Sequence, residues 1–265
     1  MKIARFRADR RTAFGVVEGE EVVEIRGSIY SRFRKTDIRY GLAKVKLLPP
    51  SEAPQIWCPG ANFADRLKLA ERSWDASSPA RLEHPEPWRK GVNALTGPED
   101  PIVIPKDSLG EVHFEGEVVA VIAKACRRVT PQQAPKYILG YTCGNDVSER
   151  DWQKEDRSPW RSKGADSFAP VGPWVETDVD PQRLELIVRV NGREVQRACT
   201  KDMRFSFAQI VSYISQQVTL RPGDLVFSGS SGATGALHPG DVVEVEIPSV
   251  GLLRNPVVAE FDSSK

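Results

Sequence analysis

The chain has 265 residues, enough to bury a substantial core in one large domain or in a small domain followed by a larger one. Its 37 Lys and Arg residues almost balance 36 Asp and Glu residues, and a formal net charge of +1 excludes the strong basic excess of a nucleic-acid-binding protein. The chain has no apolar run near the roughly 18 residues of a membrane span and no signal peptide at its start. Its four cysteines lack metal-binding spacing. We therefore expect a cytoplasmic protein with reduced thiols that binds neither nucleic acid nor membrane.

The first part of the chain predicts a small β-rich domain. Residues 11–25 predict a β-hairpin, because short runs of Val, Ile and Phe flank a Glu-Gly turn. Pro49 and Pro50 then interrupt the chain, and Pro54 follows them. We therefore predict a small N-terminal β-rich domain over residues 1–50 and a larger domain over residues 51–265.

A long segment near the start of the larger domain differs from the rest in composition. Residues 65–90 are charged and contain several prolines and a Ser-Ser-Pro run. They predict a long loop with one short helix near residues 66–72. Because long loops inside compact domains are commonly functional, we predict a lid at about residues 65–90.

Strand patterns dominate from residue 101 onward, with few helices. Apolar residues alternate with polar ones over 184–190 and 241–247, and Asn191-Gly192 is a strong hairpin signal. A short helix is predicted to begin at Thr130-Pro131. Ser206 with Gln209 predicts a capping box, followed by apolar residues at helical spacing up to Val218. The predicted class is α+β and β-rich, with mainly antiparallel or mixed sheets.

Two glutamates flank Gly116 just before an apolar run. In an extended strand Glu115 and Glu117 point to the same face, with Cα atoms roughly 6.6 Å apart. A hard divalent cation relieves their repulsion, since Mg²⁺ and Mn²⁺ favour oxygen ligands. The alternative is a pair of exposed glutamates at the mouth of an ordinary strand.

A second polar cluster follows the strand-like residues 139–145. Asp146 offers a third carboxylate, and Arg150 and Gln153 follow it at helical spacing, where both can face one ligand. Lys163 lies in a segment punctuated by glycine and proline, which predicts a loop that carries a cation toward an anionic substrate.

Together these blocks resemble the fumarylacetoacetate hydrolase superfamily. The resemblance covers roughly residues 55–258 in order, and the leader resembles the small N-terminal domain of many bacterial members. The blocks are the E-x-E pair, G-Y-T-x-x-N-D-V-S-x-R-D-x-Q at 140–153, K-x-x-D-x-F-x-P-x-G-P-W at 163–174, N-G-x-x-x-Q at 191–196, and the upstream G-A-N-F at 60–63 and W-R-K at 88–90.

The resemblance implies a mixed β-roll or sandwich as the catalytic domain, built around a metal. Its ligands would be Glu115, Glu117 and Asp146, and the ion Mg²⁺ or Mn²⁺, with Ca²⁺ accepted by the same oxygens. Lys163 would lie beside metal and substrate, which makes it a candidate catalytic residue together with Glu115. Such a metal stabilises an enolate as a Lewis acid.

The same resemblance implies the substrate and its pocket. Arg150, Gln153 and Lys90 would contact a small 2-oxo or 1,3-diketo acid. Members of the family are C–C bond hydrolases such as acylpyruvases, decarboxylases, tautomerases and isomerases, some of them in aromatic catabolism, and they are commonly homodimers.

One departure from the family pattern concerns the base. Many C–C hydrolases of the family have N-Y-x-x-H and then a glutamate, a dyad thought to activate water. This chain has Arg66 in place of the histidine and Leu69 in place of the glutamate. A guanidinium is no base at neutral pH, so we place Arg66 among the candidate catalytic residues as a cation for the distal carboxylate of a dicarboxylic substrate. Glu71 and His84 are alternative bases.

A second departure lies in the family's T-G-T-P-x-G loop, which reads S-G-S-S-G-A at 228–233. Ser230 keeps a hydroxyl for a substrate carboxylate and is a candidate binding residue. Three functions remain open. The first is a metal-dependent C–C hydrolase of 2-oxo acids. The second is a tautomerase, isomerase or decarboxylase of oxaloacetate-like or 2-hydroxyhepta-2,4-diene-1,7-dioate-like substrates. The third is a catalytically silent relative kept as a binding protein.

Overall fold

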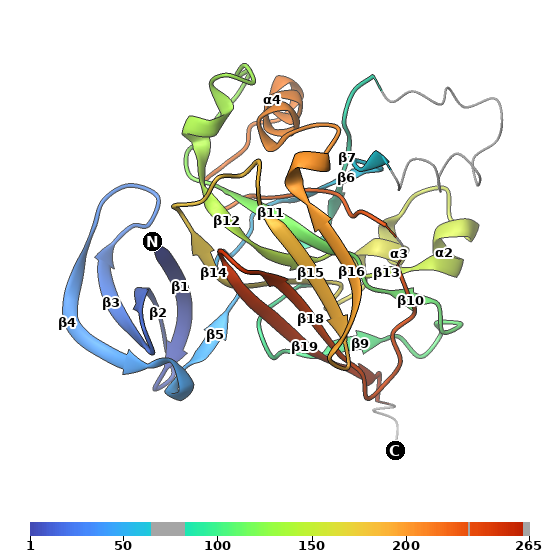
Figure 1. Cartoon of the computed structure of the whole chain (residues 1–265), viewed down its shortest axis with the longest axis horizontal. Helices are drawn as coiled ribbons and strands as arrows, with labels where there is room; N and C mark the ends of the chain where they lie inside the picture. The colour runs from blue at the N-terminus through green and yellow to red at the C-terminus, as the bar shows by residue number, and fades with distance from the viewer. Residues whose placement is uncertain (65–82, 233, 262–265) are drawn as a thin grey trace.

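The computed structural model describes residues 1–64, 83–232 and 234–261. Among these residues the strands form one sheet of twelve, a second sheet of five and a two-stranded pair (Figure 1). No helix in the described part of the chain is long and apolar enough to cross a membrane. The predicted α+β, β-rich class is confirmed.

The N-terminal strands form an antiparallel meander. Its strands are β1 (Lys2–Ala8), β2 (Arg11–Glu18), β3 (Glu21–Gly27) and β4 (Phe33–Gly41), with β5 (Lys46–Leu48) returning to β1. The hairpin predicted over residues 11–25 is confirmed as β2 and β3, and Gly19 in its turn has a φ of +62°, which favours glycine. Alternate residues of β1 supply two small apolar clusters, with Ile3 in one and Phe6 in the other.

The large sheet continues from this meander into the rest of the chain. β1 pairs with β14 (Ala169–Glu176) through Lys2↔Glu176 and Ile3↔Val175. The sheet then runs through β12 (Ile138–Asn145), β11 (Gly116–Ile122), β17 (Leu225–Phe227), β6 (Ile56–Gly60) and β7 (Glu86–Lys90), and β8 (Leu95–Thr96) pairs with β14. Every residue of β11 is buried, so this strand lies in the main core.

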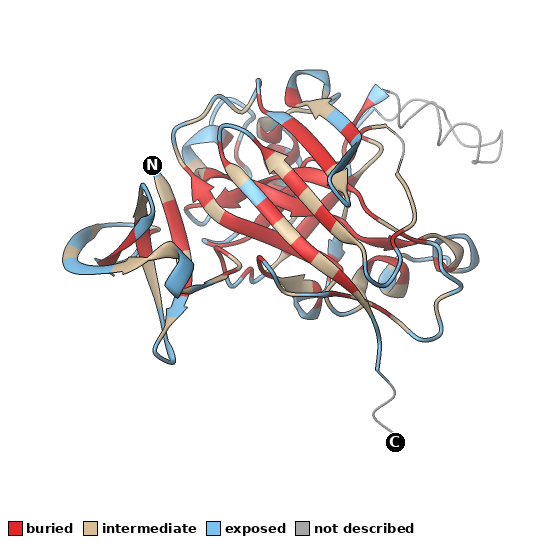
Figure 2. Ribbon diagram, turned by 60° about the horizontal axis from the view of Figure 1, so that its bottom comes forward, coloured by how far each residue is buried: buried red, intermediate tan, exposed pale blue. Residues whose placement is uncertain are grey.

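The second sheet packs against the first. Its order is β16 (Arg193–Cys199), β15 (Glu185–Val190), β18 (Val242–Ile247), β19 (Gly251–Ala259) and β9 (Ile102–Ile104). The predicted turn at Asn191 and Gly192 joins β15 to β16 with φ values of 52° and 77°, as a tight hairpin requires. Figure 2 shows buried residues along the strands of both layers.

Helices occupy the ends of the sheets. Those in the described part of the chain are α2 (Arg150–Glu155), α3 (Trp160–Gly164) and α4 (Phe207–Gln217), with short 3₁₀ turns at Leu42–Lys44, Val92–Ala94, Ala134–Tyr137 and Thr200–Asp202. The two-stranded pair is β10 (Val112–His113) and β13 (Ser148–Glu149). The capping box of Ser206 and Gln209 is confirmed at the start of α4.

Two local predictions differ from the structure. The helix predicted at Thr130 is a turn followed by a 3₁₀ helix that starts at Ala134, because Pro131 and Pro135 leave few backbone N–H donors for an α-helix. The last residues of the predicted lid, Glu86–Lys90, form β7, which pairs with β6 over its whole length. The rest of that lid up to residue 82, with the helix predicted near 66–72, lies outside the described residues.

Candidate active site

Three carboxylates meet where β11 begins and β12 ends. Glu115 directly precedes β11, Glu117 is its second residue, and Asp146 follows β12, the antiparallel neighbour of β11. One carboxylate oxygen of each residue lies within 4.8 Å of the others, and all three residues are buried. The structure therefore brings together the three residues that the sequence predicts as metal ligands.

Local backbone contacts fix this meeting point. The Asn145 side-chain oxygen accepts a hydrogen bond from Glu115 N at 2.9 Å, and Asp146 N donates to Glu115 O at 2.8 Å. A Cβ at Gly116 would stand 2.2 Å from a methyl group of Val188, so only glycine lets β11 approach β15 this closely. The close packing of the Glu115–Glu117 segment against β15 thus depends on the glycine between the two glutamates.

Two cations contact these carboxylates from the helices. Lys163 Nζ lies 2.5 Å from Glu115 Oε2 and 2.7 Å from Asp146 Oδ2, and Arg150 forms an ion pair with Glu115 Oε1. Lys163 lies in the short helix α3 and not in the predicted loop, because Pro159 and Gly164 bound a single helical turn. Its ammonium bridges two of the candidate ligands.

A third cation, Lys90, lies beneath the cluster. Its side chain has no exposed surface, and its Nζ lies 2.6 Å from Asp146 Oδ1. It also donates to the backbone carbonyls of Val147 at 2.9 Å and Phe168 at 2.7 Å. The ammonium thus contacts one carboxylate and two backbone carbonyls, whereas Asp146 Oδ1 makes no hydrogen bond of regular geometry among the described residues. The prediction placed Lys90 against the substrate, and this stays a prediction; in the structure its ammonium contacts Asp146.

The electrostatics of the cluster fit a divalent cation. Burial, together with the charges of Asp146 and Glu115, raises the pKa of Glu117 well above its usual range. Burial lowers the pKa of Lys163, but the charges of Asp146 and Glu115 outweigh this effect and leave it raised, so the ammonium stays charged. A cation held by the three carboxylates would relieve the cost of ionising Glu117, and their hard oxygen atoms suit Mg²⁺ or Mn²⁺.

The raised pKa of Glu117 predicts that metal binding depends on pH. Because the carboxyl must lose its proton to coordinate, the affinity for Mn²⁺ should rise as the pH increases through the raised pKa of Glu117, with release of up to about one proton per ion. The increase in melting temperature on adding Mn²⁺ should then be larger at pH 8 than at pH 6. Calorimetry in buffers of different ionisation enthalpy measures the released protons.

The control for this prediction is Glu117→Gln, which cannot release that proton. Equal proton release from this variant and from the unaltered protein would contradict the assignment to Glu117. So would an Mn²⁺ affinity of the unaltered protein that falls as the pH rises.

A polar chain reaches the cluster from the side of α2. Arg150 donates to Gln153 Oε1 at 2.8 Å within α2 and to Thr234 Oγ1 at 3.2 Å. Thr234 in turn contacts His113 Nδ1 at 3.0 Å, and Glu111 contacts the other ring nitrogen at 2.9 Å. The structure thus joins Arg150 to Gln153, as the helical spacing predicts, and adds Thr234 to their surroundings.

The segment Ser228–Ser231, called the 228–231 loop below, lies beside Glu117. Gly229 N donates to Glu117 Oε2 at 2.7 Å. The Ser230 hydroxyl is buried and has no hydrogen-bond partner among the described residues. The predicted binding residue Ser230 is therefore adjacent in sequence to Gly229, a direct partner of the carboxylate cluster.

The sequence did not reveal one aromatic side chain near the carboxylates, and some candidate residues lie outside the part of the chain that the structure describes. The Trp88 ring lies 5.3 Å from Lys163 Nζ and 6.0 Å from Lys90 Nζ, a cation–π arrangement that its W-R-K block does not reveal. His84, an alternative base, stacks on Tyr213 of α4 with ring centroids 5.6 Å apart. The candidates Arg66 and Glu71 and the departure at Leu69 lie outside the described residues.

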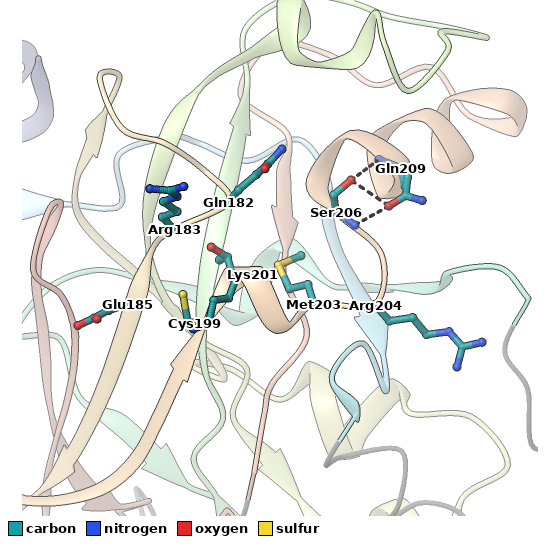
Figure 3. Close-up of a pocket in the computed structure, with 10 residues that line it drawn as sticks. Gln182, Arg183, Glu185, Cys199, Lys201, Met203, Arg204, Ser206 and Gln209 are labelled. Carbon is teal, nitrogen blue, oxygen red and sulfur yellow. Dashed lines mark hydrogen bonds between the residues drawn. The ribbon is translucent and has the colours of Figure 1, made fainter.

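A separate groove lies between the start of β15 and the start of α4. Its cavity volume is about 650 Å³, and its lining includes Cys199, Lys201, Met203 and Gln209. Figure 3 shows these side chains, with the hydrogen bonds of the capping box at one end of the groove. All four cysteines are free thiols, and of these Cys199 is partly exposed whereas the other three are buried.

Two family profiles match the chain. Residues 55–258 match the family described as fumarylacetoacetate (FAA) hydrolase C-terminal, and residues 1–50 match Rv2993c-like, N-terminal. The chain is 40% identical over 268 residues to Protein Rv2993c of Mycobacterium tuberculosis, covering 97% of this chain and 98% of that protein.

Solved structures are similar over nearly the whole chain. A 2-hydroxyhepta-2,4-diene-1,7-dioate isomerase from Mycobacterium marinum is 38% identical with a TM-score of 0.89, covering 99% of this chain and 100% of that one. A maleylpyruvate hydrolase from Sphingobium sp. SYK-6, in complex with manganese(II) and pyruvate, is 26% identical with a TM-score of 0.80, covering 98% and 100%.

Proposed function

The chain belongs to the fumarylacetoacetate hydrolase family of enzymes, and on this premise we propose that it is a divalent-metal-dependent enzyme acting on a small 2-oxo or 1,3-diketo carboxylate. The observation that carries the proposal is the buried meeting of Glu115, Glu117 and Asp146, bridged by the Lys163 ammonium. A relative with manganese and pyruvate supports the choice of metal and of ligand class.

Each side chain around the cluster has a distinct task in this proposal. A cation bound by the three carboxylates supplies a Lewis acid that favours negative charge on the 2-oxo oxygen of the substrate. Lys163 adds a positive charge beside that oxygen and holds a proton near it, since its ammonium is already at the cluster. Arg150 and Gln153 present N–H donors from α2 to the substrate carboxylate.

Other groups exclude water and orient the substrate. Trp88 covers the two lysines from one side. The hydroxyl of Ser230 offers one more hydrogen bond to a carboxylate, since it is buried without a described partner. Burial strengthens each of these interactions, because charges attract more strongly where water is scarce.

We propose C–C bond hydrolysis, as in an acylpyruvase, as the first candidate reaction. The second is isomerisation, tautomerisation or decarboxylation of a dicarboxylic substrate. Two observations favour the second: Arg66 stands where many hydrolases of the family have histidine, and the similar structure from Mycobacterium marinum is an isomerase of a dienedioate. Hydrolysis requires a base for water, whereas isomerisation needs only proton transfer beside the enolate.

A titration with Mn²⁺ and oxalate tests the metal and the ligand class. Oxalate mimics the carboxylate and 2-oxo oxygens, so it should bind only after the metal. We expect Mn²⁺ to raise the melting temperature and oxalate to raise it further, since each ligand that binds only the folded state stabilises it. A panel of acylpyruvates, oxaloacetate and dienedioates, followed by absorbance, then identifies the reaction.

The outcomes of this titration separate the candidates. An oxalate effect that is equal with and without metal would exclude the proposed mode of binding. Binding of Mn²⁺ and oxalate without turnover of any member of the panel would favour a silent binding protein. Matched controls are malonate, whose carboxylates are spaced further apart, and the Glu117→Gln variant.

A further inference from the structure

Gln196 is the one buried residue of β16, a strand whose other residues are exposed or partly exposed. It lies opposite Val188 of β15, whose methyl group bounds the space at Gly116. Its carboxamide therefore points from the edge of the second sheet toward the carboxylate cluster. Burying an amide costs free energy unless its donor and acceptor are used.

Both ends of this carboxamide bind backbone groups of the site. Its Oε1 accepts from Gly116 N at 3.3 Å, at the residue between Glu115 and Glu117. Its Nε2 donates to Ser231 O at 2.5 Å, at the end of the 228–231 loop. One side chain thus joins the Glu115–Glu117 segment, which carries two carboxylates, to the loop that carries the Ser230 hydroxyl.

A second buried amide holds the other end of the same loop. Asn62 Nδ2 donates to Ser228 O at 2.7 Å. Between the two held carbonyls, Gly229 N donates to Glu117. The 228–231 loop is therefore fixed at both ends by carboxamides and in the middle by a candidate metal ligand, and the freedom left to it is small.

We propose that Gln196 is a positioning residue that sets the distance between the metal-binding carboxylates and the Ser230 hydroxyl, and so the fit of the substrate carboxylate. The proposal rests on the proposed function, because it assigns Ser230 to the substrate. The two hydrogen bonds have separate effects: the one to Ser231 O places the loop, and the one to Gly116 N places the glutamates.

Two variants of Gln196 distinguish the effects of its hydrogen bonds to Gly116 N and Ser231 O. Gln196→Met keeps the shape and removes both hydrogen bonds, whereas Gln196→Glu keeps an acceptor for Gly116 N and removes the donor to Ser231 O. Gln217→Met at the exposed end of α4 is the matched control. The measurements are the dissociation constants of Mn²⁺ alone and of oxalate in saturating Mn²⁺, with the melting temperature of each variant.

We expect oxalate to bind about tenfold more weakly to Gln196→Met, because the hydrogen bond to Ser231 O that places the loop is lost and the loss of one buried hydrogen bond has an effect of this size. Gln196→Glu should show the same loss for oxalate with Mn²⁺ affinity within about threefold of the unaltered protein, and Gln217→Met should change neither constant.

A purely structural role would lower the melting temperature and leave the oxalate constant of the folded variants unchanged, which would overturn the proposal. If Gln196→Met does not fold, an unchanged dissociation constant of oxalate for Gln196→Glu would also overturn the proposal. Failure of the unaltered protein to bind Mn²⁺ or oxalate would instead contradict the proposed function.

Discussion

Asp146→Asn should remove both metal binding and a large part of the stability of the folded protein. Among the described residues, Asp146 is the one carboxylate that pairs with both buried lysines, Lys163 through Oδ2 and Lys90 through Oδ1. An amide in its place leaves the fully buried Lys90 without its counter-charge. Loss of one partner of a buried ion pair costs about 3–5 kcal/mol of unfolding free energy, and we expect a cost of that size.

The same variant should lose Mn²⁺ affinity by at least about 100-fold. Loss of a partner that merely orients a ligand already costs roughly 10–100-fold, and here a ligand itself is lost. Calorimetry with Mn²⁺ and denaturant unfolding measure the two effects separately. Asp151→Asn is the control, because its 2.8 Å pair with the largely exposed Lys154 is a surface ion pair worth about 0–1 kcal/mol.

The assignment of Asp146 fails if Asp146→Asn binds Mn²⁺ within tenfold of the unaltered affinity. If the variant has normal stability but no longer binds Mn²⁺, Asp146 is a metal ligand, but its ion pairs with the two buried lysines do not stabilise the fold. The two readouts therefore test two separate statements about the same carboxylate.

Lys163→Met should lower kcat by a factor of roughly 10²–10⁴, the range expected for loss of a positioned proton donor and its charge. Lys163 contacts two candidate ligands but is not a ligand itself. Mn²⁺ binding should therefore survive the change, and an unbranched apolar side chain of similar length keeps the packing against Trp88.

The measurement is steady-state kinetics with the best substrate of the panel, together with the Mn²⁺ dissociation constant. Lys154→Met, which removes an exposed lysine of α2, is the control. A kcat within tenfold of the unaltered value would show that Lys163 takes no part in the reaction. A loss of Mn²⁺ binding would show that it organises the ligands.

Local signals in the sequence predicted local structure well. The Ser206 capping box and the Asn191-Gly192 turn depend on residues a few positions apart, and both are found where they were expected. Glu115 and Glu117 face one site because strand geometry alternates side chains. The polar cluster after residue 145 offered Asp146 as a third carboxylate, but its role as a ligand beside Glu115 and Glu117 followed from the resemblance to the family, since nothing in the sequence marks β11 and β12 as neighbours.

Features that depend on long-range packing were not predictable in this way. Lys90 has the appearance of a surface residue in its charged segment, yet the sheet buries it completely beneath Asp146. The bonds of Gln196 join residues 80 and 35 positions away. The helical state of Lys163 was missed because the proline and glycine that bound one helical turn are also the usual signals of a loop.

The distribution of the thiols makes this protein suitable for labelling at a single site. Burial raises the pKa of Cys126 to about 11 and that of Cys143 to about 12, and burial raises the pKa of Cys58 well above its usual range. A maleimide dye at neutral pH reacts with accessible thiolates, which favours the partly exposed Cys199. A fluorophore attached there would sit in the groove beside α4 and would report changes in that groove in the unmutated protein.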